Sequence, residues 1–593
     1  MPRRRKERLR AGVCFAVIFI VLILILILIC TAKFPERDEC QRGMFRKAAV
    51  ASDSLTCSNI GRDILRSGGS AVDGAIAALI CTSVMNPQSM GLGGGVIFTI
   101  REKSGKVKII NARETTPKDF KADLLSNCGN VTGVHWVAVP GELRGYERAH
   151  RLYGRLPWKR LFEPTIRMAR DGVKISAMLS RYLFVLKEQH TALSWLFKHA
   201  NGTLLKEGDT LKFEKLADTL QRIADGGAEE FYSGDVAQAL VRDVQAAGGS
   251  LTLEDLKSFE VTESEAWSVS LDKYTMFFPP PPAGGAILSF ILNIMEGYTM
   301  HPTSIKNHEG ALTYHRYVEA CKFANGLKQL IKDPKFSSDK EARSLIKVEF
   351  ADRVRAMISS NITHDAQYYN MTPHADTQGT THISVLAEDG TAVSVTSTIN
   401  HIFGSRVLSS NTGVILNNEL ADFCGRTKHI HPGERPPSSM APVVLYSPSE
   451  KHTLVIGASG GSMITTGMAM ALMNYLWLGK TLKESIASPV VYVDGKNELG
   501  FEKSFDQALM NYLWLGKTLK ESIASPVVYV DGKNELGFEK SFDQDVIKAL
   551  RRLGHTVTTR QYFYNTVNAV SKHEDECVNA ISDRRKMGEP AGY

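Results

Sequence analysis

The pattern of apolar and polar residues separates a short N-terminal apolar run from a long globular part. Residues 11–32 contain no charged side chain. As a helix rising about 1.5 Å per residue, this run would span roughly 33 Å, enough for the core of a bilayer. It is longer than the apolar region of a cleaved signal peptide, and no clear small-residue cleavage site follows it. The pattern therefore predicts an uncleaved transmembrane signal anchor.

The charges next to this run predict its orientation. Residues 1–10 hold six basic side chains and one acidic side chain. Because positive residues stay on the cytoplasmic side, we expect residues 1–10 to be a cytoplasmic tail and the rest of the chain to lie outside the cytosol. These ten residues supply +5 of the formal net charge of +8, so the remainder is nearly balanced and gives no indication of nucleic-acid binding.

Beyond the anchor, residues 33–47 are polar and are predicted to form a stalk. Residues 53–66 and 70–84 both show helical spacing of apolar positions, which predicts a helical hairpin. The middle of the chain, about 136–350, is mostly helical in pattern. The four consecutive prolines at 279–282 are expected to be extended polyproline II.

A change of pattern near residue 380 marks the first candidate for chemistry. Residues 363–379 are polar and aperiodic, whereas residues 380–398 alternate apolar and polar side chains on either side of Asp389-Gly390, which predicts a loop followed by a β-hairpin. Thr380 therefore opens a strand directly after Gly379. If the chain were cut between them, Thr380 would gain an α-amine with a pKa of about 8 that could act as the base for its own hydroxyl. A threonine that opens a strand is otherwise usually structural.

A second candidate lies in residues 452–477, whose pattern predicts a strand, a glycine-rich turn and a helix. The turn contains G-x-S-x-G centred on Ser459, which makes Ser459 a candidate serine nucleophile. Alternatively, the amides of Gly460 and Gly461 could form an oxyanion hole near a helix N-terminus. The pattern alone does not separate these two readings from a purely structural turn.

One feature of the sequence is abnormal. Residues 471–507 and 508–544 are identical copies of one 37-residue string in tandem. Repeat arrays usually have more units and diverged ends, so these copies suggest a duplicated exon or a sequence-assembly error. The extra copy could either disturb the fold or loop out.

The cysteines and glycosylation sequons suit an oxidising compartment. Seven cysteines lie beyond the predicted anchor, namely Cys40, Cys57, Cys81, Cys128, Cys321, Cys424 and Cys577. The helical hairpin would allow a bridge between Cys57 and Cys81, while the pairing of the other five stays open. Four N-x-[ST] sequons occur, at Asn130, Asn201, Asn361 and Asn370. No metal-binding motif stands out, since His429 and His431 lie in a loop bounded by Pro and Gly.

Several ordered blocks together resemble the gamma-glutamyltransferase family, most closely its leukotriene-C4-cleaving branch. The blocks are residues 86–100, 111–114, 279–293, 379–400, 415–423, 436–440 and 457–466 and the C-terminal GEPAGY. The resemblance implies an α+β fold, the four-layer αββα sandwich of N-terminal-nucleophile (Ntn) hydrolases. It also implies autocatalytic cleavage into a large-subunit part, 48–379, and a small-subunit part, 380–593, which associate as a heterodimer.

The resemblance assigns roles to matching positions. Thr380 would be the nucleophile, Thr398 would activate it, and Gly460 and Gly461 would form the oxyanion hole. The α-carboxylate of the donor would be held by Arg113, Ser438 and Ser439, and its α-ammonium by Asn400, Glu419 and Asp422. Arginine suits a carboxylate because it can donate two parallel hydrogen bonds. Cys57 and Cys81 match a cysteine pair of the family.

Together with the predicted anchor and its orientation, the resemblance leads us to expect a single-pass type II enzyme of the plasma membrane that needs no cofactor. Its donors would be glutathione, glutathione S-conjugates and leukotriene C4, and water, an amino acid or a dipeptide would be the acceptor. Two alternatives stay open. The chain could be an uncleaved, catalytically silent membrane glycoprotein because of the duplication, or a serine hydrolase that uses Ser459.

Overall fold

The computed structural model describes Ile23, Cys40 and residues 44–304, 307–370, 379–488, 491–493, 499–501, 544–555, 557–558, 566–574 and 576–593. The chain divides into two units, Met1–Arg42 and Gly43–Tyr593. The predicted tail and anchor lie outside the described residues except for Ile23, which is helical and exposed. Among the helices of the described residues, none is long and apolar enough to cross a membrane.

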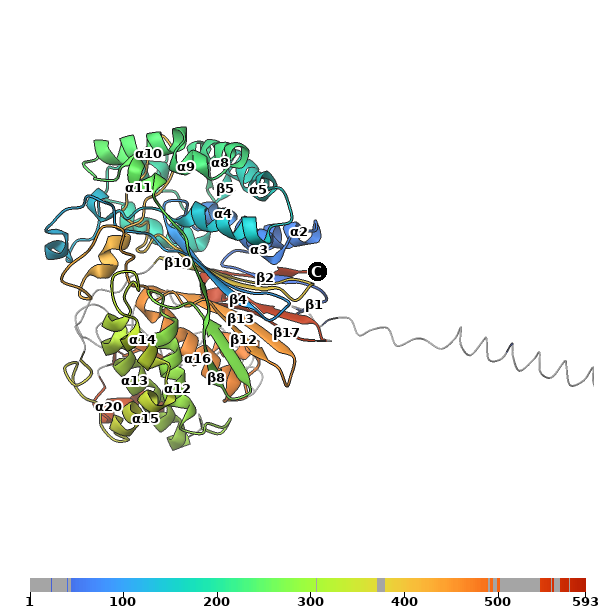
Figure 1. The fold of residues 1–593 in the computed structure, drawn as a ribbon, viewed down its shortest axis with the longest axis vertical. Coiled ribbons are helices and arrows are strands. Elements are labelled where there is room, and N and C mark those ends of the chain that lie inside the picture. Colours follow the sequence, from blue (N-terminus) through green and yellow to red (C-terminus); the bar gives the residue numbers. More distant parts are fainter. Residues whose placement is uncertain are drawn as a thin grey trace, which may run out of the picture. The chain divides into compact units, whose positions relative to one another are not determined.

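Two seven-stranded sheets form the centre of the second unit (Figure 1). Sheet I has the strand order β19 (Ala591–Gly592), β2 (Ala49–Ala51), β10 (Thr380–Leu386), β11 (Ala392–Thr398), β3 (Gly95–Arg101), β4 (Val107–Ala112) and β7 (Thr262–Glu265). Sheet II has the order β1 (Met44–Phe45), β18 (Val578–Ile581), β17 (Thr566–His573), β13 (His452–Ser459), β12 (Val443–Ser447), β9 (Tyr274–Phe278) and β8 (Trp267–Leu271). All strand pairings within these two sheets are antiparallel.

Helices cover the outer face of each sheet (Figure 1). On sheet I lie α2 (Leu55–Arg66), α3 (Ala71–Met85), α4 (Glu142–Tyr153), α5 (Trp158–Asp171), α6 (Ala177–Tyr182), α7 (Ala192–Leu196), α8 (Glu214–Gly226), α9 (Glu229–Tyr232), α10 (Asp235–Ala246) and α11 (Leu253–Lys257). On sheet II lie α12 (Gly285–Glu296), α13 (Asn307–Leu327), α14 (Lys340–Leu345), α15 (Val348–Met357), α16 (Ile464–Leu476), α17 (Leu482–Ala487) and α20 (Gln544–Arg552).

Three apolar clusters account for this layering. One joins the helices of the first set to residues of sheet I such as Phe98 and Val395, and another joins the second set to residues of sheet II such as Phe278 and Ile456. A third, smaller cluster of mostly alanine and valine side chains lies between the sheets. The small side chains allow the two sheets to approach closely. The predicted four-layer αββα arrangement is therefore present.

The two hairpins predicted from the sequence are confirmed. The α2–α3 hairpin is held by the Cys57–Cys81 disulfide, and Ser70 and Asp73 form a capping box that starts α3. The β10–β11 hairpin turns at Asp389-Gly390, as its alternation indicates.

Two details differ from expectation. The Pro281–Pro282 bond is cis and lies in a turn before α12, so the proline run is not continuous polyproline II. A proline pattern does not specify the isomer of each bond, because the cis and trans forms differ by only about 0.5–1 kcal/mol. In addition, Met44 and Phe45, which the sequence places in the stalk, form β1 and pair with β18.

The described elements of the repeated sequence come from its first copy. This copy supplies the end of α16, then α17, β14 (Val491–Val493) and β15 (Leu499–Phe501). The chain is described again from Gln544, the last residue of the second copy, where α20 begins. β15 then pairs with β16 (Val557–Thr558), and β17 takes its place in the centre of sheet II. Every described strand of sheets I and II lies outside the repeat, whereas β14 and β15 belong to a separate three-stranded sheet with β16.

This leads to a test of the duplication. Removing residues 508–544 leaves the same chain as removing 471–507, because the copies are identical. We expect the shortened chain to keep the fold, with a thermal unfolding midpoint equal to or above that of the full chain, because a shorter connection costs slightly less closure entropy. Differential scanning fluorimetry of the two purified chains measures this. A midpoint lowered by several degrees would show that the second copy contributes to the folded core.

Candidate active site

Thr380 and Thr398 face each other across the centre of sheet I. Thr380 is the first residue of β10 and Thr398 the last of β11, and the antiparallel register pairs them directly. Directly paired residues point their side chains to the same face of a sheet. Both are buried, and their hydroxyl oxygens lie 3.3 Å apart. The hairpin thus fixes the pair through seven consecutive residue pairings.

The Thr398 hydroxyl also contacts the peptide bond that precedes Thr380. It donates to the carbonyl oxygen of Gly379 at 2.5 Å and accepts from the backbone N–H of Asn400 at 2.8 Å. A hydroxyl has one proton to give, so the Thr380 hydroxyl must be the donor between the two threonines. Thr398 therefore polarises the Gly379 carbonyl, and Thr380 is the residue that directly follows this carbonyl in the chain. A side chain at residue 379 would clash with the carbonyls of Asn400 and His401, so only glycine fits.

A fully buried lysine fixes the start of β10 from the other side. Lys586, in the 3-10 helix η7 (Arg584–Lys586), donates to the backbone carbonyl of Thr380, to Asp53 at 2.7 Å and to the Ser459 hydroxyl at 3.1 Å. Burial lowers the pKa of Lys586, and the carboxylate of Asp53 opposes this shift. Asp53 also accepts from Thr381 and Asn568. One buried ion pair thus joins both sheets at Thr380.

The glycine-rich turn of the second candidate lies at the end of β13. Gly460 and Gly461 have positive φ angles of 129° and 58°, which glycine adopts without strain, and they lead through η6 (Gly461–Met463) into α16. Ser459 is fully buried, and its hydroxyl lies 2.7 Å from that of Thr566 and accepts from Lys586. β13 lies between antiparallel neighbours, unlike the parallel strands of the hydrolase fold to which a nucleophile elbow belongs. This geometry gives Ser459 a structural role, because its hydroxyl lies beside Lys586, which also bonds to the carbonyl of Thr380.

The charged residues of the predicted donor site lie together. Arg113, directly after β4, is buried and bonds to Glu419 and to Asp422 at 2.6 Å, both on η5 (Glu419–Phe423). Its other donors reach the carbonyls of Pro436 and Pro437 at 3.2 and 3.1 Å. Burial opposes the charge of Arg113, but the neighbouring carboxylates outweigh it and raise its pKa.

The remaining predicted binding residues adjoin this cluster. Ser438 and Ser439 follow the two prolines that Arg113 contacts, and Ser438 accepts from the N–H of Met440. Asn400 donates to the carbonyl of Asn418 at 3.1 Å, next to Glu419, while its own N–H reaches Thr398. Asn400 thus connects the threonine pair to the charged cluster.

The charged cluster contains more acid than base. Glu114 is buried 3.8 Å from Arg113, so three carboxyl groups surround one guanidinium. Burial raises the pKa of Glu114 to about 7 against the opposing charge of Arg113, and burial also raises that of Glu419. The cluster therefore changes its proton content near neutral pH.

Other predicted residues are placed as follows. The four sequon asparagines Asn130, Asn201, Asn361 and Asn370 are exposed. A second disulfide, Cys128–Cys424, was not predicted, and it joins segments on either side of Thr380. Among the described cysteines, Cys321 is the free one, and it is buried.

Comparison with known proteins agrees with this geometry. The family model of gamma-glutamyltranspeptidase matches residues 57–509 and 503–593, two segments that meet within the tandem repeat. The chain belongs to the gamma-glutamyltranspeptidase family. The resemblance seen in the sequence is thereby confirmed.

Relatives and solved structures extend this result. The chain is 42% identical to glutathione hydrolase 5 proenzyme of Mus musculus, with 98% of this chain and 99% of the relative covered, and 42% identical to the Homo sapiens protein of that name, with 93% and 94% covered. Cephalosporin acylase from Bacillus halodurans has the same fold, with a TM-score of 0.77 at 22% identity over 95% of this chain and 98% of the other. Gamma-glutamyltranspeptidase of Helicobacter pylori matches with a TM-score of 0.50 at 26% identity over 53% of this chain and 92% of the other. The fold is thus the Ntn-hydrolase type.

Sequence reasoning missed Lys586, Asp53 and Glu114. Lys586 adjoins the C-terminal GEPAGY block and Glu114 ends the block at 111–114, so proximity to these blocks was a usable signal. Asp53 had none, because a single aspartate before a helix reads as a capping residue.

The buried ion pair can be tested through stability. Replacing Lys586 by Met leaves Asp53 as a buried carboxylate without its cation, which costs about 3–5 kcal/mol. We expect a clear loss in the urea unfolding midpoint, and we expect Asp53→Asn in the same chain to restore part of it. As a matched control, Lys451→Met removes an exposed lysine paired with Glu574 and should change stability by at most about 1 kcal/mol. Equal losses in the two lysine variants would contradict the structural importance of Lys586.

Proposed function

We propose that this chain is a γ-glutamyl hydrolase and transferase that cuts its own Gly379–Thr380 bond and then uses Thr380 as its nucleophile. The observation that carries this proposal is the Thr398 hydroxyl, which donates to the Gly379 carbonyl while lying 3.3 Å from the Thr380 hydroxyl. The names of the relatives from mouse and human, glutathione hydrolase 5 proenzyme, support both the activity and a maturation step.

The self-cleavage follows from this geometry. The Thr380 hydroxyl oxygen attacks the carbonyl carbon of Gly379, and the hydrogen bond from Thr398 stabilises the negative charge that develops on the oxygen. The C–N bond breaks, the nitrogen of Thr380 takes up the proton that the attacking hydroxyl has lost, and an ester links Gly379 to the threonine oxygen. Water then hydrolyses this ester. The products are a large fragment ending at Gly379 and a small fragment, 380–593, that begins with a free α-amine.

The same threonine then attacks the γ-glutamyl donor. Its α-amine, with an ordinary pKa of about 8, accepts the hydroxyl proton as the oxygen attacks the γ-carbonyl of the donor. Gly460 and Gly461 donate their amides to the resulting oxyanion. The protonated α-amine gives this proton to the nitrogen of the leaving amine or cysteinylglycine, the C–N bond breaks, and a γ-glutamyl ester remains on Thr380. Water completes hydrolysis, while an amino acid or a dipeptide completes transfer.

The charged cluster recognises the zwitterionic end of the glutamyl group. Arg113 binds the α-carboxylate, together with Ser438 and Ser439. Glu419 and Asp422 bind the α-ammonium, together with Asn400. In the ligand-free chain Arg113 is paired with both of these carboxylates. The donor would replace the internal ion pairs of Arg113 by pairs with its own two charges, so its charges meet partners that are already in position.

We further propose glutathione, its S-conjugates and leukotriene C4 as donors, and an extracellular site at the plasma membrane with residues 11–32 as the anchor. The identity to proteins named glutathione hydrolase 5 supports the first part. The Cys57–Cys81 and Cys128–Cys424 disulfides and the exposed sequon asparagines support the second, because disulfides persist outside the cytosol.

Replacement of Thr380 tests the nucleophile. Thr380→Ala should leave one uncut, inactive chain, while Thr380→Ser should be cut and retain reduced activity because serine keeps the hydroxyl. The wild-type chain should give two bands on a denaturing gel with reductant but a single band without it, because Cys128–Cys424 joins the two fragments. A wild-type chain that stays whole under reduction yet hydrolyses γ-glutamyl anilides would rule out the mechanism.

The charged cluster predicts a pH dependence of donor binding. The pKa of Glu114 is raised to about 7, so the cluster gains protons and loses negative charge as the pH falls through this value. Its attraction for the α-ammonium then weakens, and the donor KM should rise below pH 7. Initial rates with a γ-glutamyl anilide between pH 6 and 9 measure this, and Glu114→Gln should flatten the profile. A KM that falls with acidification would contradict the assignment.

A further inference from the structure

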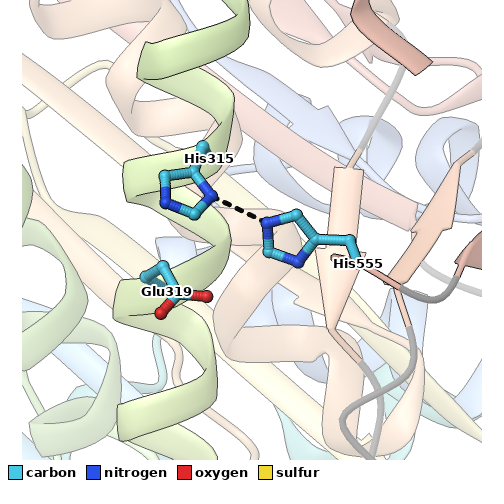
Figure 2. A group of neighbouring side chains, drawn as sticks. All are labelled: His315, Glu319 and His555. Atoms are coloured by element: carbon cyan, nitrogen blue, oxygen red, sulfur yellow. Dashed lines mark hydrogen bonds between the residues drawn. The ribbon is translucent and has the colours of Figure 1, made fainter. Parts of the chain in front are cut away.

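A buried polar network lies outside the active site, in the helical layer on sheet II. His315 and Glu319 are one turn apart on α13 and point toward His555, which follows α20 (Figure 2). All three are buried, and one imidazole nitrogen of each histidine and one carboxylate oxygen of Glu319 lie within 4.8 Å of one another. Lys322, one further turn along α13, is also buried beside them.

The hydrogen bonds fix where the protons are. The Lys322 ammonium, which has protons only to give, lies 3.2 Å from Nδ1 of His555, so this nitrogen accepts. Nε2 of a neutral His555 then carries the proton and donates to Nδ1 of His315 at 2.8 Å. Nε2 of His315 in turn donates to the carbonyl of Ser359 at 2.8 Å. Burial lowers the pKa of both histidines, that of His555 to about 2, which keeps them neutral.

The acidic side of the network is equally well bonded. Glu319 accepts from the hydroxyls of Thr363 and Tyr369 at 2.6 and 2.7 Å, and Lys322 donates to Thr363 at 2.6 Å. The N–H of Thr363 donates to the carbonyl of Leu553, directly after α20. One ammonium, one carboxylate and two neutral imidazoles make the group electrically balanced.

This order of protons does not suit a metal ion. A cation bound by His315, Glu319 and His555 would need the Nε2 lone pair of His555, where the network places a proton. It would also lie beside the Lys322 ammonium, which is 3.7 Å from Glu319. The group is therefore better described as a hydrogen-bond network that holds residues 359–369 against α13 and the end of α20.

The segment that this network holds precedes the proposed cleavage bond in the chain. Ser359, Thr363 and Tyr369 lie in the stretch that ends ten residues before Gly379. On the other side of that bond, Thr380 is held by Lys586 and Thr398. Attack on the Gly379 carbonyl requires its carbon to stay within reach of the threonine oxygen, and rates fall steeply when such alignment is lost.

We propose that the His315–His555 pair is a positioning device for self-cleavage, which anchors the chain upstream of Gly379 so that the bond is presented to Thr380. This inference rests on the proposed function. After cleavage, the same contacts hold the end of the large fragment to the small fragment, because His555 and Leu553 belong to the small one.

The test separates cleavage from catalysis in the full-length chain. Pulse-chase labelling with a reducing gel measures the conversion of precursor to fragments. Active-site titration followed by kcat and KM measurement describes the matured fraction. For His555→Ala we expect conversion to slow about tenfold or more, whereas kcat and KM of the matured fraction stay within about twofold of the wild type, because alignment is needed before the cut and not after it.

Two further variants make the result specific. His555→Gln can place an amide donor near the position of Nε2 and should recover most of the conversion rate. His190→Ala removes an exposed histidine and should behave as the wild type. If His555→Ala does not accumulate as folded protein, His315→Gln replaces it in the comparison. The glutamine amide can still donate to Ser359, but it places no acceptor at the position of Nδ1 for His555. This variant should also slow conversion.

Other results would overturn the inference. These are conversion of His555→Ala at the wild-type rate, or equal losses in conversion and in kcat. Stoichiometric zinc in the purified wild type, measured by mass spectrometry and absent from His555→Ala, would reassign the group as a metal site. If the wild-type chain is never cut, the proposed function fails and not this inference alone.

Discussion

The buried ammonium of Lys586 is the interaction on which the arrangement of the site depends. It joins Asp53, near the start of the folded unit, to Thr380 in sheet I and Ser459 at the end of β13 in sheet II. A buried cation is tolerated only when its donors are satisfied, so these three partners must be in place together. Because Lys586 lies close to the C-terminus, the start of β10 takes its final position only when the whole chain has folded.

Two chemically different regions meet at this position. The threonine pair is neutral and depends on strand register and on a glycine that leaves no room for a side chain. The cluster around Arg113 is ionic and depends on burial, which strengthens its charges and raises the pKa of Glu114. Asn400 bonds to both regions, so one residue in a positive-φ conformation connects the threonine pair to the charged cluster. The proposed function requires such a fixed spacing, because the two ends of one donor would have to meet these two regions at once.

What the sequence predicted correctly was local. The β10–β11 hairpin, the strand and glycine turn before α16, and the Cys57–Cys81 bridge each follow from periodicity and turn residues within a few tens of positions. The partners that the sequence missed are distant in the chain. Lys586 lies 206 positions from Thr380, and His555 lies 240 positions from His315. No pattern in one sequence encodes such pairs, because they form only when separate elements pack. The family blocks predicted Arg113, Glu419 and Asp422 as site residues. They did not predict that these residues pair with one another.

The Cys128–Cys424 disulfide has a consequence for the unfolded chain. Its cysteines are 296 positions apart, and the Gly379–Thr380 bond lies inside the ring that they close. An unfolded ring of this size has fewer configurations than an open chain, which by polymer estimates stabilises the fold by roughly 5 kcal/mol. Breaking the peptide bond would open this ring and return those configurations to the unfolded state. Maturation would thus lower the relative stability of the fold without removing a single folded contact, while the sulfur bridge keeps the two pieces one molecule.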